Sequence, residues 1–169
     1  MIRADQHLLL VGMMGVGKTT VARVVADRLH RRVYDSDAII EARTGRTVRE
    51  IFAEDGEAAF RQLETEVLLE SLALPEPVVI AGAGGVVLSD VNRAAMKASG
   101  ARVVWLCADP MTLVDRVKGG GHRPLLDADP AGTLQRMFRE REALYREVAD
   151  AIVLVDNRSI SEVVEAVLR

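Results

Sequence analysis

Residues 8–20 read Leu-Leu-Leu-Val-Gly-Met-Met-Gly-Val-Gly-Lys-Thr-Thr, an apolar run that leads directly into a glycine-rich loop. The loop matches the pattern G-x-x-x-x-G-K-[ST] through Gly12, Gly17, Lys18 and Thr19. In this pattern the glycines let backbone N–H groups close around phosphate oxygens, the lysine reaches the transferred phosphate, and the hydroxyl ligates Mg²⁺. The sequence therefore predicts a site for a nucleoside triphosphate, in preference to a plain glycine-rich turn before a helix.

The residues on either side of the loop support this prediction. Leu8–Val11 have the composition of a buried strand, and Val21, Ala22, Val25 and Leu29 recur at helical spacing. A helix that begins directly after the loop turns the positive end of its dipole toward the bound anion.

The composition fits one globular protein. The chain has 169 residues, of which 49% are hydrophobic, enough for a single α/β domain with a sizeable core. Its net charge of −3 and its 4% of aromatic residues argue against nucleic acid as a partner. The longest apolar stretch, Val78–Leu88, is interrupted by glycines and is too short to cross a bilayer. We expect a cytoplasmic monomer with no membrane or nucleic-acid partner.

Strand and helix signals alternate along the chain, which predicts βαβ units and a parallel sheet. The expected strands are Leu8–Val11, Arg32–Asp35, Val78–Ala81, Arg102–Cys107 and Ile152–Val155. The expected helices are Lys18–Leu29, Glu57–Leu72, Asp90–Ala98, Pro110–Val117, Thr133–Val148 and Ile160–Leu168. No repeat or linker divides the chain, so residues 1–169 are expected to form one domain.

Two segments interrupt this alternation. Residues 36–74 are too helical for a linker and are expected to form a substrate-binding subdomain beside the sheet. Residues 119–132 combine three consecutive glycines with two prolines and two aspartates. Irregular segments of this length are often lids or binding loops, and the alternative is an ordinary solvent-exposed loop.

A phosphate loop of this kind usually works with a carboxylate at the end of a neighbouring strand, which holds the water shell of Mg²⁺. Asp35 and Asp37 follow a short expected strand, and their i, i+2 spacing lets one face the metal and the other a substrate. The alternative for this pair is N-capping of the next helix. Asp109 also follows an apolar strand, but Asp109-Pro110 is more typical of a helix start.

Basic residues gather between Arg116 and Arg146, where seven lysines and arginines outnumber four aspartates and glutamates. Guanidinium groups bind phosphates and carboxylates bidentately, so this segment suits an anionic ligand. Some of these residues are expected to pair with glutamates on the helix surface. Arg61 and Glu64, at i, i+3, form either a surface ion pair or an arginine oriented by a carboxylate, and the sequence leaves both open.

Several motifs occur in the order and spacing of a known family. They are Asp-x-Asp at 35–37, Ile51-Phe52-x-x-x-Gly56-Glu57-x-x-Phe60-Arg61-x-x-Glu64, the glycine cluster at 82–85, Arg123-Pro124-Leu125-Leu126 and Arg141-x-x-Leu144-Tyr145. Together with the phosphate loop they resemble shikimate kinase over almost the whole chain. The loop alone would indicate only an NTP-binding protein, so the resemblance rests on the order of the other motifs.

The resemblance implies a fold like that of nucleoside monophosphate kinases: three layers (α/β/α) around a five-stranded parallel sheet, with a helical substrate-binding subdomain and a lid. It implies phosphoryl transfer from ATP to the 3-hydroxyl of shikimate, with Mg²⁺ as the cofactor. Lys18, Asp37 and Arg123 would be the catalytic residues. Arg123 would close over the phosphates from the lid, and Asp37 would align the attacking hydroxyl.

The resemblance also assigns the binding residues. The ATP-binding residues would be Gly15, Val16, Gly17, Lys18, Thr19, Thr20, Arg116, Arg123 and Arg158, with Arg116 and Arg158 at the adenine. The shikimate-binding residues would be Asp37, Arg61, Gly84 and Arg141. Thr19 would ligate Mg²⁺, and Asp35 would hold it through water.

Ala83 departs from the family pattern, which has a glycine at this position of the run Gly82-Ala83-Gly84-Gly85. If the position needs a positive φ, alanine costs about 1–2 kcal/mol there. If it does not, the methyl group merely lines the pocket.

Two other functions are compatible with the phosphate loop. The first is another small-molecule kinase, such as gluconate kinase; a neutral polyol as its substrate would leave Arg61 and Arg141 without an anionic partner. The second is a nucleotide-sensing module without turnover, which would not need the Asp35 and Asp37 pair. Phosphorylation of shikimate accounts for more of the residues than either alternative.

Overall fold

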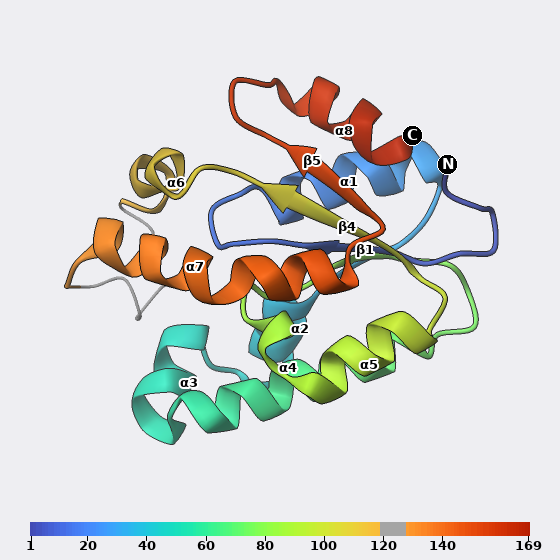
Figure 1. Cartoon of the computed structure of the whole chain (residues 1–169). Coiled ribbons are helices and arrows are strands. Elements are labelled where there is room, and N and C mark those ends of the chain that lie inside the picture. Colours follow the sequence, from blue (N-terminus) through green and yellow to red (C-terminus); the bar gives the residue numbers. More distant parts are fainter. Residues whose placement is uncertain (119–127) are drawn as a thin grey trace.

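The computed structural model describes residues 1–118 and 128–169 (Figure 1). In chain order its elements are β1 (Leu8–Val11), α1 (Lys18–Leu29), β2 (Val33–Asp35), α2 (Ser36–Thr44), α3 (Val48–Asp55), α4 (Glu57–Leu72), β3 (Val79–Ala81), the short 3₁₀ helix η1 (Val86–Leu88), α5 (Asp90–Ala98), β4 (Arg102–Cys107), α6 (Pro110–Val117), α7 (Pro130–Val148), β5 (Ala151–Leu154) and α8 (Ile160–Leu168).

The five strands form one parallel sheet in the order β2-β3-β1-β4-β5. β1 occupies the centre, where Leu8 pairs with Val79 of β3 on one side and with Arg102 of β4 on the other. All four β1 side chains are fully buried. A parallel strand that is covered on both faces reads as a continuous apolar run, which is why Leu8–Val11 could be recognised in the sequence.

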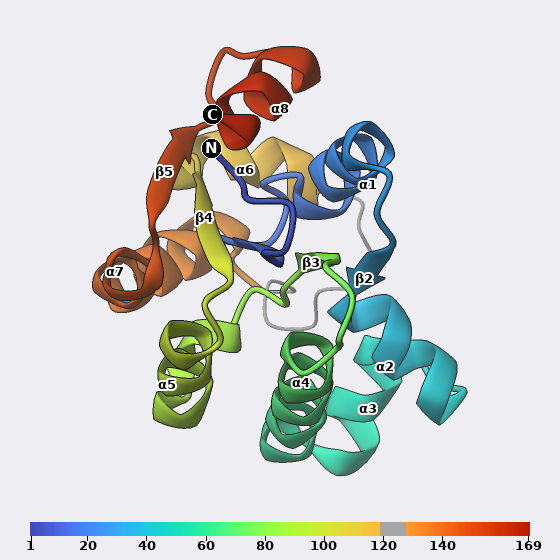
Figure 2. The same ribbon diagram turned by 90° about the vertical axis from the view of Figure 1, so that its right-hand side faces the viewer.

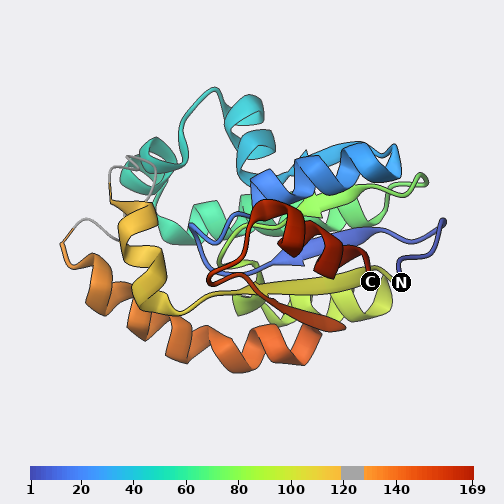
Figure 3. The same cartoon turned by 90° about the horizontal axis from the view of Figure 1, so that it is seen from above.

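Helices cover both faces of the sheet. Figure 2 shows α1 and α8 on one face and α4, α5 and α7 on the other, and α1 packs against α8. The view from above shows the two termini close together, at the end of the sheet where β1 begins (Figure 3). The predicted three-layer fold with a five-stranded parallel sheet is confirmed. None of the helices described is both long and apolar enough to cross a membrane.

The start of α7 differs from the prediction. The helix begins at Pro130 rather than Thr133, because the Asp129 side chain accepts a hydrogen bond from the Gly132 N–H at 3.1 Å and Pro130 occupies the first helical turn. Residues 130–132 of the predicted lid therefore belong to this helix. Residues 119–127 of that segment, including Arg123, lie outside the described residues.

Residues 36–74 contain three helices with a small core of their own. The Asp35 side chain caps α2, and a reciprocal capping box between Thr47 and Glu50 begins α3. The buried apolar side chains of this small core are Ile40, Val48, Ile51, Phe60 and Val67. This separate core holds α2, α3 and α4 together beside the sheet, so that their side chains can form a wall of a site at the sheet edge.

The burial of β1 generates a stability prediction. Leu10→Ala should lower the free energy of unfolding by about 2–5 kcal/mol, because it leaves a cavity between two covered faces of the sheet. Leu154→Ala, on the edge strand and 56% exposed, should change it by less than about 0.5 kcal/mol. Urea titrations of both variants measure the difference. Equal losses would contradict the central, doubly covered position of β1.

Candidate active site

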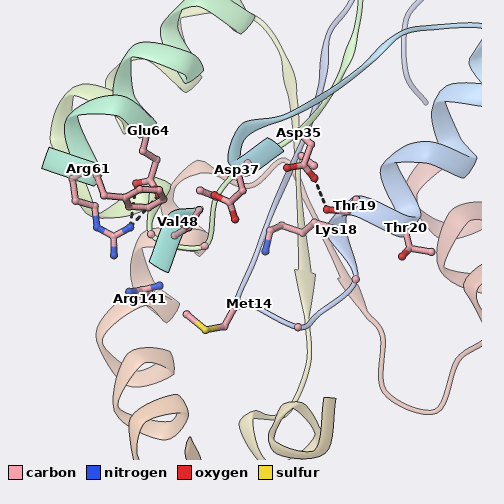
Figure 4. Close-up of a pocket in the computed structure, with 18 of the residues that line it drawn as sticks. Met14, Lys18, Thr19, Thr20, Asp35, Asp37, Val48, Arg61, Glu64 and Arg141 are labelled. Atoms are coloured by element: carbon pink, nitrogen blue, oxygen red, sulfur yellow. Dashed lines mark hydrogen bonds and ion pairs between the residues drawn. The ribbon is translucent and has the colours of Figure 1, made fainter. Parts of the chain in front are cut away.

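The phosphate loop connects β1 to α1 at the carboxyl edge of the sheet (Figure 4). Gly12 has a φ of +147°, and a Cβ atom there would overlap the carbonyl oxygen of Leu106 in β4. A Cβ on Gly15 would lie 2.9 Å from a methyl group of Val117 at the end of α6. The Lys18 ammonium donates to the carbonyl oxygens of Gly12 at 2.7 Å and Met13 at 3.0 Å, so the lysine lies across the loop.

Asp35 links the end of β2 to the start of α1. Its Oδ2 accepts a hydrogen bond from the Thr19 hydroxyl, while its Oδ1 accepts one from the Ala38 N–H at 3.1 Å. The carboxylate therefore caps α2 and also faces the hydroxyl of the phosphate loop. N-capping is therefore confirmed for Asp35, and its role at a metal stays a prediction. Asp109, in contrast, caps α6 by accepting from the Met111 N–H at 2.8 Å, as its Asp-Pro sequence indicates.

Asp37 lies in the first turn of α2 and points into a cavity of about 370 Å³ beside the phosphate loop. Burial is the main cause that raises the pKa of its carboxyl group, and the nearby Asp35 raises it further. The Lys18 ammonium opposes both effects. The two aspartates thus have different surroundings: Asp35 accepts a hydrogen bond from the Thr19 hydroxyl, and Asp37 points into the cavity.

Arg61 and Glu64 form a buried ion pair on α4, not a surface pair. The Glu64 side chain is only 1% exposed, and its Oε2 lies 3.1 Å from Nη1 of Arg61. Nη2 of Arg61 lies 3.1 Å from the more exposed Glu57. Burial raises the pKa of Glu64 to about 7, although the Arg61 charge opposes the shift. Two carboxylates therefore fix the direction in which this guanidinium points.

The third strand's glycine cluster leaves room for Arg61. A Cβ atom on Gly85 would overlap the Arg61 guanidinium, so a side chain at this position would displace the arginine from where it lies. Ala83 is 5% exposed, and its φ is not positive. The departure from the family pattern therefore carries no backbone strain, and the Ala83 methyl group lines the cavity.

Arg141 reaches the cavity from α7, on the opposite side from α4 (Figure 4). The residue is 4% exposed, and its Nε and Nη1 have no hydrogen-bond partner among the described residues. The neighbouring Tyr145 donates its hydroxyl to the Gly84 carbonyl at 2.5 Å, and burial raises the pKa of this tyrosine to about 12. Trp105 of β4 stacks on the Tyr145 ring with 5.4 Å between ring centroids.

The cavity brings together most of the residues predicted from the sequence. Those that line it are Gly15, Gly17, Lys18, Thr19, Thr20, Asp35, Asp37, Arg61, Gly84, Arg116 and Arg141. A second hollow, on the other side of the phosphate loop between α1, α6 and α8, is lined by Val16, Arg158 and again Gly15, Gly17, Thr20 and Arg116. Arg123 lies outside the described residues.

Sequence reasoning missed the apolar wall of the cavity. Phe52 and Phe60 line it with ring centroids 4.9 Å apart, and Val48 and Met14 also line it. The two phenylalanines belong to a motif quoted for the resemblance, but they sit on different helices. Their spacing in the sequence therefore gave no sign that the rings meet.

Known proteins resemble this chain in sequence and in structure. The family model "Shikimate kinase" matches residues 14–169. The shikimate kinase of Symbiobacterium thermophilum is 42% identical over 165 residues, which are 96% of this chain and 94% of that protein. The solved structure of shikimate kinase from Acinetobacter baumannii in complex with shikimate has a TM-score of 0.92 and 35% identity, covering 96% of this chain and 90% of that one.

A gluconokinase from Sinorhizobium meliloti also has a similar structure, with a TM-score of 0.61 and 20% identity. At this level of identity the likeness shows the shared fold alone. The family model and the shikimate kinases, in contrast, match this sequence almost from end to end. This chain therefore belongs to the shikimate kinase family.

Proposed function

We propose that this protein transfers the γ-phosphoryl group of ATP to the 3-hydroxyl of shikimate in the cavity between the phosphate loop, α4 and α7. The buried guanidinium of Arg141 carries the proposal, because two of its nitrogens have no hydrogen-bond partner among the described residues. Buried donors of a charged group that lack an acceptor are costly, so this end of the cavity favours an anion. The carboxylate of shikimate is such an anion, and the Acinetobacter baumannii relative was solved with shikimate bound.

The phosphates of ATP would lie on the loop from Gly15 to Thr20. Backbone N–H groups at the start of α1 and the Lys18 ammonium would neutralise the phosphate charge. The second hollow would take the adenine, between Arg116 and Arg158. Arg123 would close over the phosphates from the segment that follows α6.

Mg²⁺ fits the donors that the loop offers. The Thr19 hydroxyl and the Asp35 carboxylate are in contact, and Mg²⁺ usually takes only one or two protein ligands beside phosphate oxygens and waters. Thr19 would ligate the ion and Asp35 would hold its water. When bound, the ion would neutralise charge on the phosphates.

Asp37 would align the attacking hydroxyl of shikimate. Asp37 lines the same cavity as Lys18, Arg61 and Arg141, so it would lie beside both substrates. Since its pKa is raised, its carboxylate is a better proton acceptor than an exposed aspartate. Phosphoryl transfer nevertheless depends mainly on positioning and charge neutralisation, so alignment would be its principal task.

Glu64 would be the residue that holds Arg61 ready for the shikimate carboxylate. Both oxygens of the buried carboxylate accept from Nη1 of Arg61, and Nη2 donates to Glu57. Nε of Arg61 has no hydrogen-bond partner among the described residues. Burial of this carboxylate lowers the stability of the fold, and active sites commonly lose stability in this way for the sake of activity.

The proposed reaction predicts a specific acceptor. ADP formation should be fast with shikimate and slow with quinate, gluconate or nucleoside monophosphates, each tested separately. Asp37→Asn should lower kcat with shikimate at least about a hundredfold, a loss of roughly 2.7 kcal/mol of transition-state stabilisation. Its thermal melting should stay close to that of the parent. Fast turnover with gluconate, or a near-normal kcat for Asp37→Asn, would contradict the proposal.

Arg141→Ala should raise KM for shikimate about ten- to a hundredfold, because a charge-assisted hydrogen bond is lost. KM for ATP should change little. Arg139→Ala is the matched control, since Arg139 lies on the same helix but is exposed to solvent. Steady-state kinetics with each substrate varied in turn would separate the two effects. A rise in KM for ATP alone would move Arg141 to the nucleotide site.

Glu64→Gln should make stability less dependent on pH. The folded-state pKa of Glu64 is about 7, above its ordinary value of 4.5, so the folded protein binds this proton more tightly than the unfolded chain. The parent therefore loses stability as pH rises from about 4.5 to 7, and the glutamine variant does not. Between pH 5 and pH 8 the parent should lose about 2–3 kcal/mol relative to the variant. Urea unfolding at both pH values tests this, and a constant difference would refute it.

A further inference from the structure

Two aspartates tie β4 to β5, one at each end of the strand pair. Near the amino end, the Val103 N–H donates to Oδ2 of Asp150 at 2.8 Å. Beyond the carboxyl end, the Asp109 N–H donates to Oδ2 of Asp156 at 2.9 Å. Between these points the strands pair through their backbones, up to the bond from the Val155 N–H to the Cys107 carbonyl at 2.9 Å. The Asp156 carboxylate thus continues the strand pairing one step past the last backbone bond.

The bond between the Asp109 N–H and Asp156 lies where the chain segments that follow β4 and β5 separate. After β4 the chain turns into α6, which carries Arg116, and after β5 it passes through Arg158 into α8. Asp109 is itself the N-cap of α6, so a bond to its N–H holds the beginning of that helix. Arg116 and Arg158 line the hollow that would take the adenine. The bond between Asp109 and Asp156 therefore joins the two segments that carry these arginines.

The surroundings of Asp156 differ from those of an ordinary stabilising bond. Its second oxygen, Oδ1, is buried and has no hydrogen-bond partner among the described residues. A buried acceptor of this kind reduces stability and calls for an explanation. The bond that joins the two chain segments is made by the other oxygen, Oδ2.

We propose that Asp156 is a positioning residue for nucleotide binding, which sets the separation between Arg116 and Arg158 through its bond to the Asp109 N–H. This inference rests on the proposed placement of ATP. It assigns to the adenine site a residue that does not line the hollow itself. The consequence is selectivity, because a hollow of fixed width distinguishes one base from another better than a loose one.

The test compares two alanine variants that remove the same kind of bond. Asp156→Ala should raise KM for ATP about three- to tenfold and reduce the ratio of kcat/KM for ATP over GTP, with KM for shikimate unchanged. Asp150→Ala removes the matching bond at the far end of the same strands and should leave all three quantities as in the parent. Asp156→Asn should restore KM for ATP, since an amide oxygen can also accept the Asp109 N–H. If Asp156→Ala does not fold, Asp156→Ser replaces it, because its side chain is too short to reach that N–H.

Several outcomes would overturn the inference. Equal changes in KM for ATP in Asp156→Ala and Asp150→Ala would mean a general loosening of the sheet. An Asn variant as impaired as the alanine one would mean that the negative charge matters and not the hydrogen bond. The variant Arg116→Ala distinguishes a failure of the proposed ATP site from a failure of the role proposed for Asp156. If it leaves KM for ATP unchanged, the placement of the nucleotide is wrong; if it raises KM while Asp156→Ala does not, only the role of Asp156 fails.

Discussion

The close packing of the phosphate loop against β4 and α6 is the constraint on which the site depends. Gly12 lies against the carbonyl of Leu106, and Gly15 lies against Val117, so side chains at these two positions would push the loop away from the sheet. The loop in turn fixes where α1 begins, and with it the ammonium of Lys18 and the hydroxyl of Thr19. Other parts of the active site are arranged around this fixed loop.

The parallel sheet then determines which side chains can meet there. The carboxyl ends of parallel strands share one edge, and ligands of such folds bind in the crevice outside it. Asp35 and Asp37 follow β2, Gly84 and Gly85 follow β3, and the phosphate loop follows β1. The two arginines come from α4 and α7, two helices that cover the same face of the sheet. The cavity therefore combines the phosphate loop at one end with two guanidinium groups at the other.

The sequence predicts those features that depend on residues close together in the chain. The phosphate loop, the doubly buried strand before it and the Asp-Pro start of α6 all depend on residues within a few positions of one another. The start of α7 was missed because Asp129 and Pro130 follow a glycine-rich segment and resemble part of a loop.

Other features depend on how helices and strands pack, which brings together residues that no short sequence pattern connects. The burial of Glu64, which turns an i, i+3 pair into an oriented arginine, is set by packing around α4. The bond between the Asp109 N–H and Asp156 joins residues 47 positions apart, and no spacing rule predicts it. The same holds for the contact of Phe52 with Phe60, which depends on how α3 packs against α4.

The stack of Trp105 on Tyr145 has a practical consequence. Trp105 is the single tryptophan of the chain, and it is 1% exposed. Tyr145 connects its ring to the Gly84 carbonyl, at the wall where the acceptor would bind. Tryptophan emission from this protein therefore comes from one buried indole, placed a single aromatic ring away from that wall. With shikimate bound as proposed, this native indole would report on its binding without any label or substitution.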